Sequence, residues 1–227
     1  MSKNNSTDDD PIKIFLDWYL EAQTGMGSRF TKNRVISTGT HLLRRMLSAV
    51  SPWANLFRPD IATLATISPE SRPSARSVLF KGLVEGGFSF YTDYESDKGK
   101  ELEINPSAVM VFYWHFPPRQ VRIDGKVCKL SRKAAENDWK SRTRENQTAS
   151  LALRQSSIIR GRDELVEKAN YAKLLYRGKP IPCPDSWGGY RLVPYKIEFW
   201  EGRFDWLHHR EKYLLNNGCW EKVYLAP

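Results

Sequence analysis

The stretch ARSVLFKGLVEGGFSFYT (Ala75–Thr92) holds two short segments rich in β-branched and aromatic residues, separated by the turn-prone sequence VEGG. Such segments are typical of β-strands, and glycines between them favour a tight turn. Similar segments lie on either side: IATLATI (Ile61–Ile67), AVMVFYW (Ala108–Trp114) and RQVRIDGKVCKL (Arg119–Leu130). Short strands with short connections favour an antiparallel barrel over parallel β-α-β units. We therefore predict a mainly β (α+β) fold.

Helices are expected to flank these strands. Asp10 followed by Pro11 is a favourable helix start, and apolar residues keep helical spacing to about Gln23. Ser131 is expected to cap a helix over RKAAENDWKSR, and Asp163 one over ELVEKANYAKLLYRG.

The C-terminal part returns to strands at WGGYRLVPYKIEFW and WEKVYLAP. Gly125, within a predicted strand, is interpreted as a bulge or tight turn. We see no linker, and we divide the chain into an N-terminal helical arm, residues 1–60, and a barrel domain, residues 61–227.

Composition narrows the possible partners. The net charge is +9, from 35 Lys and Arg against 26 Asp and Glu, but the basic residues are scattered. Scattered charge favours phosphorylated small molecules over nucleic acid, which needs a basic cluster. No apolar run approaches the roughly 18 residues that a membrane span requires. We expect no nucleic-acid or membrane partner.

The three cysteines, Cys128, Cys183 and Cys219, are far apart and odd in number, so neither a disulfide framework nor a metal site is expected. This use of cysteine, with no apolar signal segment at the N-terminus, favours the cytoplasm. Nucleotide-binding, zinc-protease and serine-hydrolase motifs (GxGxxG, GxxxxGK[ST], HExxH, GxSxG) are absent.

Cationic and hydroxyl residues recur at the ends of successive predicted strands. Arg76 and Lys81 flank one strand, Tyr91 and Thr92 end the next, and the sequence SDKGK follows. In a strand, Arg76 and Lys81 would face opposite sides. Fixed positive charge with hydroxyl donors is what phosphate binding requires. Any one of these residues is more simply explained as solvated surface charge, so only their recurrence favours a phosphate site.

Several motifs together resemble the pyridoxamine 5′-phosphate oxidase family. They are RSVLFKG, FSFYTDYESDKGKELEINP, RQVRIDGKV, SRTRENQTASLALRQSS, WGGYRLVPYKIEFWEG and the C-terminal YLAP. The resemblance implies an FMN-binding split β-barrel with flanking helices. It further implies a homodimer with FMN in clefts between the subunits, and an oxidase that uses dioxygen to convert an amine or alcohol to an aldehyde.

The resemblance also implies a set of binding residues. The expected FMN contacts are Arg76, Ser77, Val78, Leu79, Phe80, Lys81, Tyr91, Thr92, Lys98, Gln120, Gln155, Ser156, Trp200 and Arg210. The expected substrate contacts are Lys81, Asp138, Arg142, Asn146, Trp206 and His208, with His208 as the candidate catalytic donor or base. A structural role for His208 is the simpler alternative.

The chain departs from the family pattern at sites that matter for phosphate. Asp97 replaces an arginine expected near the FMN phosphate, and should weaken FMN binding unless another cation compensates. Asp138 and Asn146 replace a tyrosine and a serine around the substrate phosphate, and Trp206 replaces an arginine over the substrate ring. Two like charges about 4 Å apart repel by about 4 kcal/mol at a dielectric constant of ~20. The substrate is therefore either a pyridoxine or pyridoxamine phosphate or another small aromatic molecule, as in phenazine-pathway oxidases.

Three other functions remain as alternatives. A non-catalytic flavin-binding protein would hold FMN without being reduced by a substrate. A nucleic-acid-binding module would bind with steep salt dependence. A flavin reductase would oxidise NADH or NADPH rapidly.

Overall fold

The computed structural model describes residues 10–24 and 58–227. Helix α1 (Pro11–Thr24) begins as predicted, with the backbone N–H of Ile12 donating to Asp10 Oδ1 at 2.9 Å. The expectations for residues 1–9 and 25–57 lie outside the described residues.

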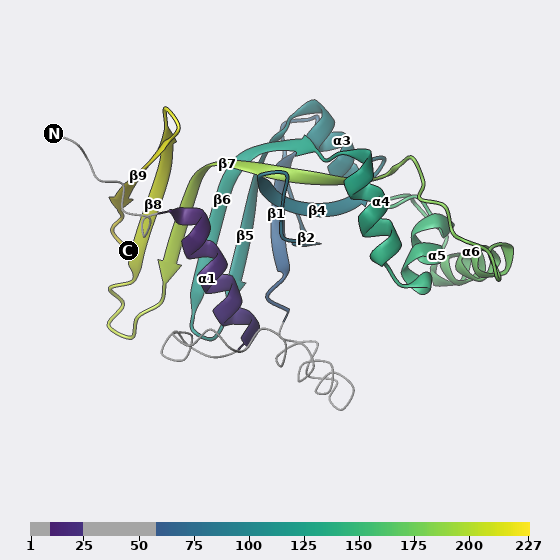
Figure 1. Cartoon of the computed structure of the whole chain (residues 1–227), viewed down its shortest axis with the longest axis horizontal. Coiled ribbons are helices and arrows are strands. Elements are labelled where there is room, and N and C mark those ends of the chain that lie inside the picture. Colours follow the sequence, from purple (N-terminus) through teal and green to yellow (C-terminus); the bar gives the residue numbers. More distant parts are fainter. Residues whose placement is uncertain (1–9, 25–57) are drawn as a thin grey trace. The chain divides into compact units, whose positions relative to one another are not determined.

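The strands form one antiparallel sheet, which confirms the predicted mainly β class (Figure 1). The described strands are β1 (Ile61–Ile67), β2 (Pro73–Leu79), β3 (Leu83–Val84), β4 (Gly87–Asp93), β5 (Ser107–Trp114), β6 (Arg119–Lys129), β7 (Trp187–Glu201), β8 (His209–Asn216) and β9 (Cys219–Tyr224). Their order is β2-β1-β5-β6-β7-β4-β3, and β8 pairs with both β7 and β9. Strands that are neighbours in the sheet thus come from distant parts of the sequence, as β4 and β7 do.

The remaining described helices are α3 (Asp97–Ile104), α4 (Arg132–Ser141), α5 (Arg144–Ala152) and α6 (Arg162–Leu175). The predicted cap of α4 is confirmed, because Ser131 Oγ accepts the backbone N–H of Ala134 at 3.3 Å. The predicted cap of α6 is wrong: Gly161 is the N-cap, and Asp163 lies in the first turn. The positive end of the helix dipole still stabilises a carboxylate in this first turn.

Two compact units divide the described residues. The first contains residues 10–24, 58–63, 110–124 and 194–227, and the second contains 64–109 and 125–193. Strands β1, β5, β6 and β7 contribute residues to both units. This division into units does not test the predicted boundary between the N-terminal arm and the barrel domain at residue 60, which stays a prediction.

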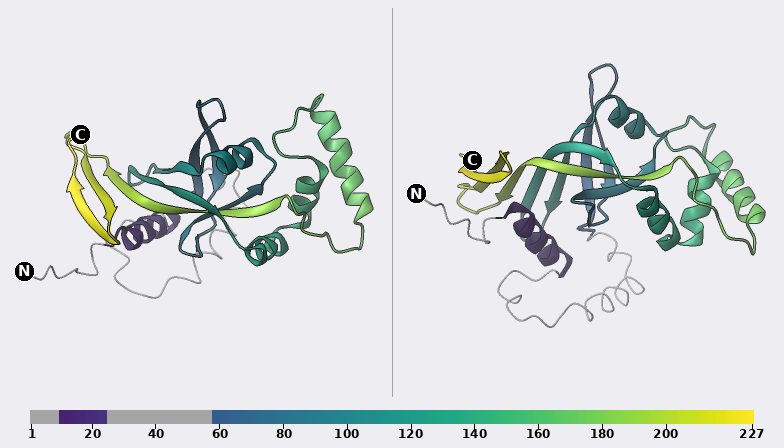
Figure 2. Two further views of the ribbon diagram at one scale, coloured as in Figure 1. Left: turned by 90° about the horizontal axis from the view of Figure 1, so that it is seen from above. Right: turned by 45° about the horizontal axis from the view of Figure 1, so that its top comes forward.

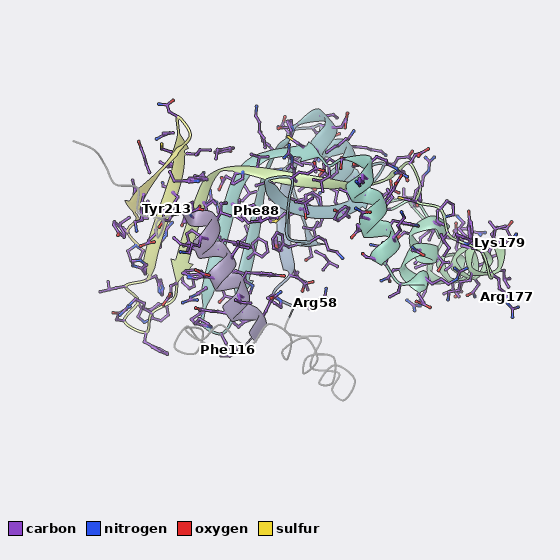
Figure 3. The ribbon with its side chains drawn as sticks, viewed as in Figure 1. Arg58, Phe88, Phe116, Arg177, Lys179 and Tyr213 are labelled. Atoms are coloured by element: carbon purple, nitrogen blue, oxygen red, sulfur yellow. The ribbon has the colours of Figure 1, made fainter. Side chains whose placement is uncertain are left out.

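The core of the first unit is aromatic. Phe15 of α1 packs edge-to-face on Phe112 at 4.9 Å, and Trp18 meets Phe199 at 5.2 Å. Figure 1 shows α1 lying along the strands that carry these partners. Tyr213, labelled in Figure 3, is buried in the same core. Each such ring contributes about 1.5–3 kcal/mol by leaving water, so the amphipathic face of α1 accounts for its position.

The core of the second unit has two parts. Phe88, labelled in Figure 3, is fully buried on β4 together with Phe90. A second cluster joins Trp139 of α4 with Ile181 and Trp187. Helices α5 and α6 pack against each other, as both views of Figure 2 show.

The interpretation of Gly125 as a tight turn is wrong, and the alternative, a bulge, stays a prediction. Gly125 lies inside the continuous strand β6. A Cβ atom there would lie 2.3 Å from the carbonyl oxygen of Val193. The glycine is therefore needed for the close approach of two backbones.

Candidate active site

A buried lysine organises one end of the second unit. Lys98 Nζ donates to Gln155 Oε1 at 3.0 Å, to Thr92 Oγ1 at 3.2 Å and to Ser96 Oγ at 3.3 Å. All three acceptors are uncharged, and no carboxylate in the described part of the chain lies within ion-pair distance of Nζ. Burial, and then the charge of Arg76, lower the pKa of Lys98. A desolvated cation held only by neutral acceptors favours an anionic ligand.

The local sequence explains how Lys98 is placed. Ser96 is the N-cap of α3, and its side chain accepts the backbone N–H of Gly99 at 3.3 Å. A Cβ at Gly99 would lie 2.1 Å from the carbonyl oxygen of Tyr94, so only glycine allows the chain to turn this closely into the helix. The side chain of Lys98 thus lies at a helix N-terminus, where exposed N–H groups and the helix dipole also favour anions.

Gln155 and Ser156 join this cluster from the segment after α5. Thr92 Oγ1 donates to Gln155 Oε1 at 2.6 Å, and the backbone N–H of Asp97 donates to Ser156 Oγ at 3.3 Å. Four of the predicted FMN contacts therefore meet in one place: Thr92, Lys98, Gln155 and Ser156. The carboxylate of Asp97 is exposed beside them.

Arg76 is held in an ion pair of its own. Its Nη2 lies 2.7 Å from Glu101 Oε2, and the guanidinium also donates to Thr66 and Ser74. Burial raises the pKa of Glu101, but hydrogen bonds from Thr66 and Arg76 outweigh it, so the pKa lies below its usual value. The carboxylate is therefore charged at neutral pH, and it holds the arginine in place.

The predicted FMN contacts that follow Arg76 lie on strand β2 or directly after it. Ser77 and Leu79 are exposed, Val78 is half-buried, and Phe80 packs in the core against Phe88. β2 ends the strand order, so among the described residues no strand pairs with its outer edge. Free backbone groups on such an edge are available to a ligand.

Among the predicted substrate residues of the second unit, Asp138 lies close to Lys81. Lys81 Nζ is 3.6 Å from Asp138 Oδ1, and this carboxylate also helps to raise the pKa of Tyr91, after the larger effect of burial. Arg142 lies four residues after Asp138, and its guanidinium stacks 4.3 Å from the centre of the Trp187 ring.

A cavity of about 360 Å³ joins the two sets of predicted contacts. Its wall includes Arg142 and Asn146 from the substrate set, and Gln155 and Ser156 from the FMN set. The sequence motifs that carry these residues are therefore neighbours in space.

The first unit holds the remaining predicted contacts, on β6, β7 and β8. Trp200 faces Arg210 across the β7–β8 pair, and Arg210 forms an ion pair with Glu198 at 2.6 Å. Arg210 Nη1 also donates to the carbonyl oxygen of Ala226 at 2.7 Å, which fixes the C-terminal segment. Gln120 is half-buried near the start of β6.

His208 lies between two indole rings. Its ring centre is 4.9 Å from that of Trp200 and 5.9 Å from that of Trp206. Nδ1 accepts the backbone N–H of Arg203 at 3.2 Å. In the neutral ring the proton is therefore on Nε2, which leaves that atom a donor.

The neighbouring residues differ from His208. Trp206 is 78% exposed with a φ of 62°, so a large flat ring is presented to solvent from a left-handed turn. His209 instead meets Glu211 at 3.1 Å on the exposed side of β8. Of the adjacent pair, His208 has two indole neighbours, whereas His209 has one aromatic neighbour, Tyr224, and pairs with a carboxylate.

Sequence reasoning missed three residues of these clusters. Glu101 and Trp187 lie within motifs that carry the resemblance, but no role was expected for them, and their partners Arg76 and Arg142 are distant in sequence. Ser96 had a weak signal, because serine followed by an acidic residue, here Asp97, is favoured at a helix start. No group of three or more metal-ligating side chains occurs in the described ranges, and no helix there is long and apolar enough to cross a bilayer.

Comparison with known proteins identifies relatives of the chain. Residues 54–176 match the family model described as pyridoxamine 5′-phosphate oxidase, and residues 187–227 match the pyridoxine 5′-phosphate oxidase C-terminal dimerisation region. A pyridoxine/pyridoxamine 5′-phosphate oxidase from Rubrobacter xylanophilus is 41% identical over 174 residues, covering 77% of this chain and 80% of the relative. One from Pseudomonas putida is 44% identical over 165 residues, covering 73% and 77%.

Two solved structures have a similar fold. PhzG from Burkholderia lata, in complex with tetrahydrophenazine-1-carboxylic acid, aligns with a TM-score of 0.70 at 30% identity, covering 82% of this chain and 91% of that one. A pyridoxamine 5′-phosphate oxidase-related, FMN-binding protein from Nostoc punctiforme aligns with a TM-score of 0.61 at 18% identity, covering 84% and 96%.

The fold and the buried cation cluster define the class: a split-barrel, FMN-dependent oxidoreductase. Both family models and the curated relatives narrow it further. The chain belongs to the pyridoxamine 5′-phosphate oxidase family. Its C-terminal segment is the family's dimerisation region, which supports the predicted homodimer.

Proposed function

We propose that the chain is an oxidase that uses dioxygen to convert the amine or alcohol of a small aromatic substrate to an aldehyde. The substrate class is pyridoxamine or pyridoxine 5′-phosphate or a related ring. The observation that supports this most directly is the buried Lys98, held by Thr92, Ser96 and Gln155 beside a cavity. Such a cluster suits the phosphate of FMN, and in the homodimer we place FMN at the subunit interface.

The residues present fit FMN. Lys98 supplies positive charge with no carboxylate at ion-pair distance among the described residues, Ser156 supplies a hydroxyl, and Gln155 supplies an amide. Bound FMN supplies the redox chemistry, since it accepts a hydride equivalent and passes electrons to dioxygen. The carboxylates of Asp97, Asp93 and Glu101 act on Lys98 electrostatically, and their charge opposes a phosphate there.

The protein's own groups orient the substrate. His208 holds a proton at Nε2 that it donates to an oxygen or nitrogen of the substrate, and its Nδ1 bond to Arg203 keeps that tautomer. Trp206 offers a stacking face for an aromatic ring. The cytoplasm remains the expected location, and the three free cysteines are consistent with a reducing compartment.

An anaerobic absorbance experiment tests this proposal. The purified protein should show flavin bands, and pyridoxamine 5′-phosphate, pyridoxine 5′-phosphate or a tricyclic amine should bleach them. Readmitted dioxygen should restore the bands. Flavin bands that no compound of this panel bleaches would support the non-catalytic alternative.

A second candidate is an oxidase of a secondary-metabolite pathway with a non-phosphorylated substrate. Asp138 and Trp206 favour it, because each stands where the resemblance implies a residue suited to phosphate or to a charged ring contact. The similarity to PhzG, whose structure holds a tetrahydrophenazine carboxylic acid, is consistent with it. Preferential bleaching by the tricyclic amine would distinguish this candidate from the first.

A further inference from the structure

Asp138 is a buried carboxylate, and one of its two oxygens has no hydrogen-bond partner among the described residues. It lies on α4 with its side chain only 5% exposed. Oδ1 is 3.6 Å from Lys81 Nζ, whereas Oδ2 accepts no hydrogen bond from any residue that the structure describes. Buried carboxylate oxygens normally have a donor, because leaving one without a partner is costly. The free oxygen therefore indicates a donor supplied from outside the described chain.

Two buried donors of the same unit also lack a hydrogen-bond partner. Arg142 Nε and Trp187 Nε1 are buried, and among the described residues neither has an acceptor. Arg142 stacks on the Trp187 ring, and both residues line the cavity of about 360 Å³. Burial lowers the pKa of Arg142, and the charge of Asp138 opposes that effect, as expected for neighbouring groups. Both unused donors thus belong to residues of the cavity wall, and the carboxylate of Asp138 acts electrostatically on one of them, Arg142.

The charge of this subsite does not suit a phosphate ester. The resemblance assigns Lys81 and Arg142 to a dianionic phosphate, but Asp138 adds one negative charge among them and pairs with Lys81. One carboxylate therefore acts against phosphate twice, by repulsion and by occupying a cation. A group that both donates and accepts hydrogen bonds would instead satisfy Asp138 Oδ2, Arg142 Nε and Trp187 Nε1 without added charge.

We propose that Asp138 sets substrate specificity, and that the subsite of Lys81, Asp138 and Arg142 takes an uncharged hydroxyl-type group in place of a phosphate ester. The hydroxyl donates to Asp138 Oδ2 and accepts from Arg142 or Trp187. This inference rests on the proposed function for the position of the substrate, and it names the substrate class of that same site.

Equilibrium dialysis with a matched ligand pair tests the inference. The probes are 4-deoxypyridoxine and its 5′-phosphate, which differ only in the ester and lack the oxidisable group at the ring's 4-position. The FMN-loaded full chain should bind the hydroxyl form at least tenfold more tightly than the phosphate. Asp138→Asn, which keeps the shape but removes the charge, should shift the ratio of the two Kd values toward phosphate by at least tenfold.

Control variants separate a local effect from a global one. Asp185→Asn removes a fully exposed carboxylate of the same unit and should leave the ratio unchanged. Asp138→Ser repeats the test if Asp138→Asn does not fold, as judged by circular dichroism and FMN content.

Two outcomes of the dialysis experiment would overturn the inference. A wild-type protein that prefers the phosphate would do so, as would a Kd ratio that the Asp138 variants leave unchanged. Neither readout needs turnover, so an enzyme that binds these ligands but never reduces its flavin would count against the proposed oxidase function instead.

Discussion

Arg76 and Glu101 form an ion pair 2.7 Å long between β2 and α3, 25 residues apart in sequence. Thr66 and Ser74 accept further hydrogen bonds from the same guanidinium. The arginine that the resemblance assigns to FMN is therefore also part of the network that joins β2 to α3. Lys98 follows the start of α3, so this network supports the position of the lysine as well.

Removing Arg76 should affect both stability and cofactor binding. Arg76→Ala leaves the Glu101 carboxylate buried without its cation, which should lower the free energy of unfolding by about 3 kcal/mol. We also expect loss of FMN. Denaturant unfolding and the flavin-to-protein absorbance ratio measure the two effects. A variant with full FMN occupancy would show that Arg76 does not serve the cofactor.

The double variant separates these roles. Arg76→Ala with Glu101→Ala removes both charges, so it should be less destabilised than the sum of the two single variants. FMN should remain absent if Arg76 contacts the phosphate directly. Recovery of FMN in the double variant would mean that the arginine acts only by neutralising Glu101.

The lowered pKa of Lys98 predicts how pH affects the cofactor. The FMN-free protein binds a proton at Lys98 less readily than an unfolded lysine, whose pKa is about 10.4. Phosphate binding needs the charged form, so FMN affinity should fall as pH rises through the lowered pKa, by as much as tenfold per pH unit. Fluorescence titration of the FMN-free protein with FMN, between pH 7 and pH 10, measures this. Lys98→Met should remove the alkaline dependence, and Lys100→Met, on the exposed side of α3, should retain it.

The same shift has a consequence for stability without FMN. Between the lowered pKa of Lys98 and about 10.4, the unfolded chain binds more protons than the folded one at this residue. The contribution of Lys98 to the free energy of unfolding therefore rises with pH across that window. Urea unfolding of the FMN-free protein should show a smaller rise in Lys98→Met than in the wild type. Equal slopes would contradict the lowered pKa.

His208 should matter for reduction of the flavin and not for its retention. In His208→Asn the amide oxygen can still accept the backbone N–H of Arg203, but the donor at Nε2 is lost. We expect the anaerobic rate of flavin reduction to fall about 10²- to 10⁴-fold, the range typical of a lost acid or base. FMN content should be unchanged. An unchanged reduction rate would leave His208 with a structural role.

Trp206 tests whether the substrate site has diverged. Trp206→Arg restores the cation that the resemblance places over the substrate ring. It should raise kcat/KM for pyridoxine 5′-phosphate about tenfold, or about 1.4 kcal/mol in transition-state stabilisation. Because Trp206 is largely exposed, stability should change little. Unchanged or lower kcat/KM would argue that the tryptophan is compatible with phosphorylated substrates.

Much of the fold could be predicted from local patterns. Asp10 and Pro11 start a helix, Ser131 caps another, and alternating β-branched and aromatic residues mark most strands. Helix α3 was missed because its sequence is polar and contains Gly99, whose role is to approach the Tyr94 backbone. Tertiary contacts of that kind leave no periodic signal in the sequence.

The site was predictable only as a set of residue types. Strand-end cations and hydroxyls indicated phosphate chemistry, and three of them, Thr92, Ser96 and Lys98, meet beside Gln155. The partners that hold them, such as Glu101 for Arg76, come from elements paired through the sheet order. Which cation stays free for a ligand depends on those pairings, so Lys98 and Lys81 could not be distinguished before the structure.

The most direct test of flavin binding is the absorbance spectrum of the purified protein after incubation with excess FMN and gel filtration. We expect flavin bands that correspond to one FMN per chain, carried by a dimer, and their loss in Lys98→Met. A colourless protein after this treatment would contradict the assignment of the Lys98 cluster as an FMN phosphate site.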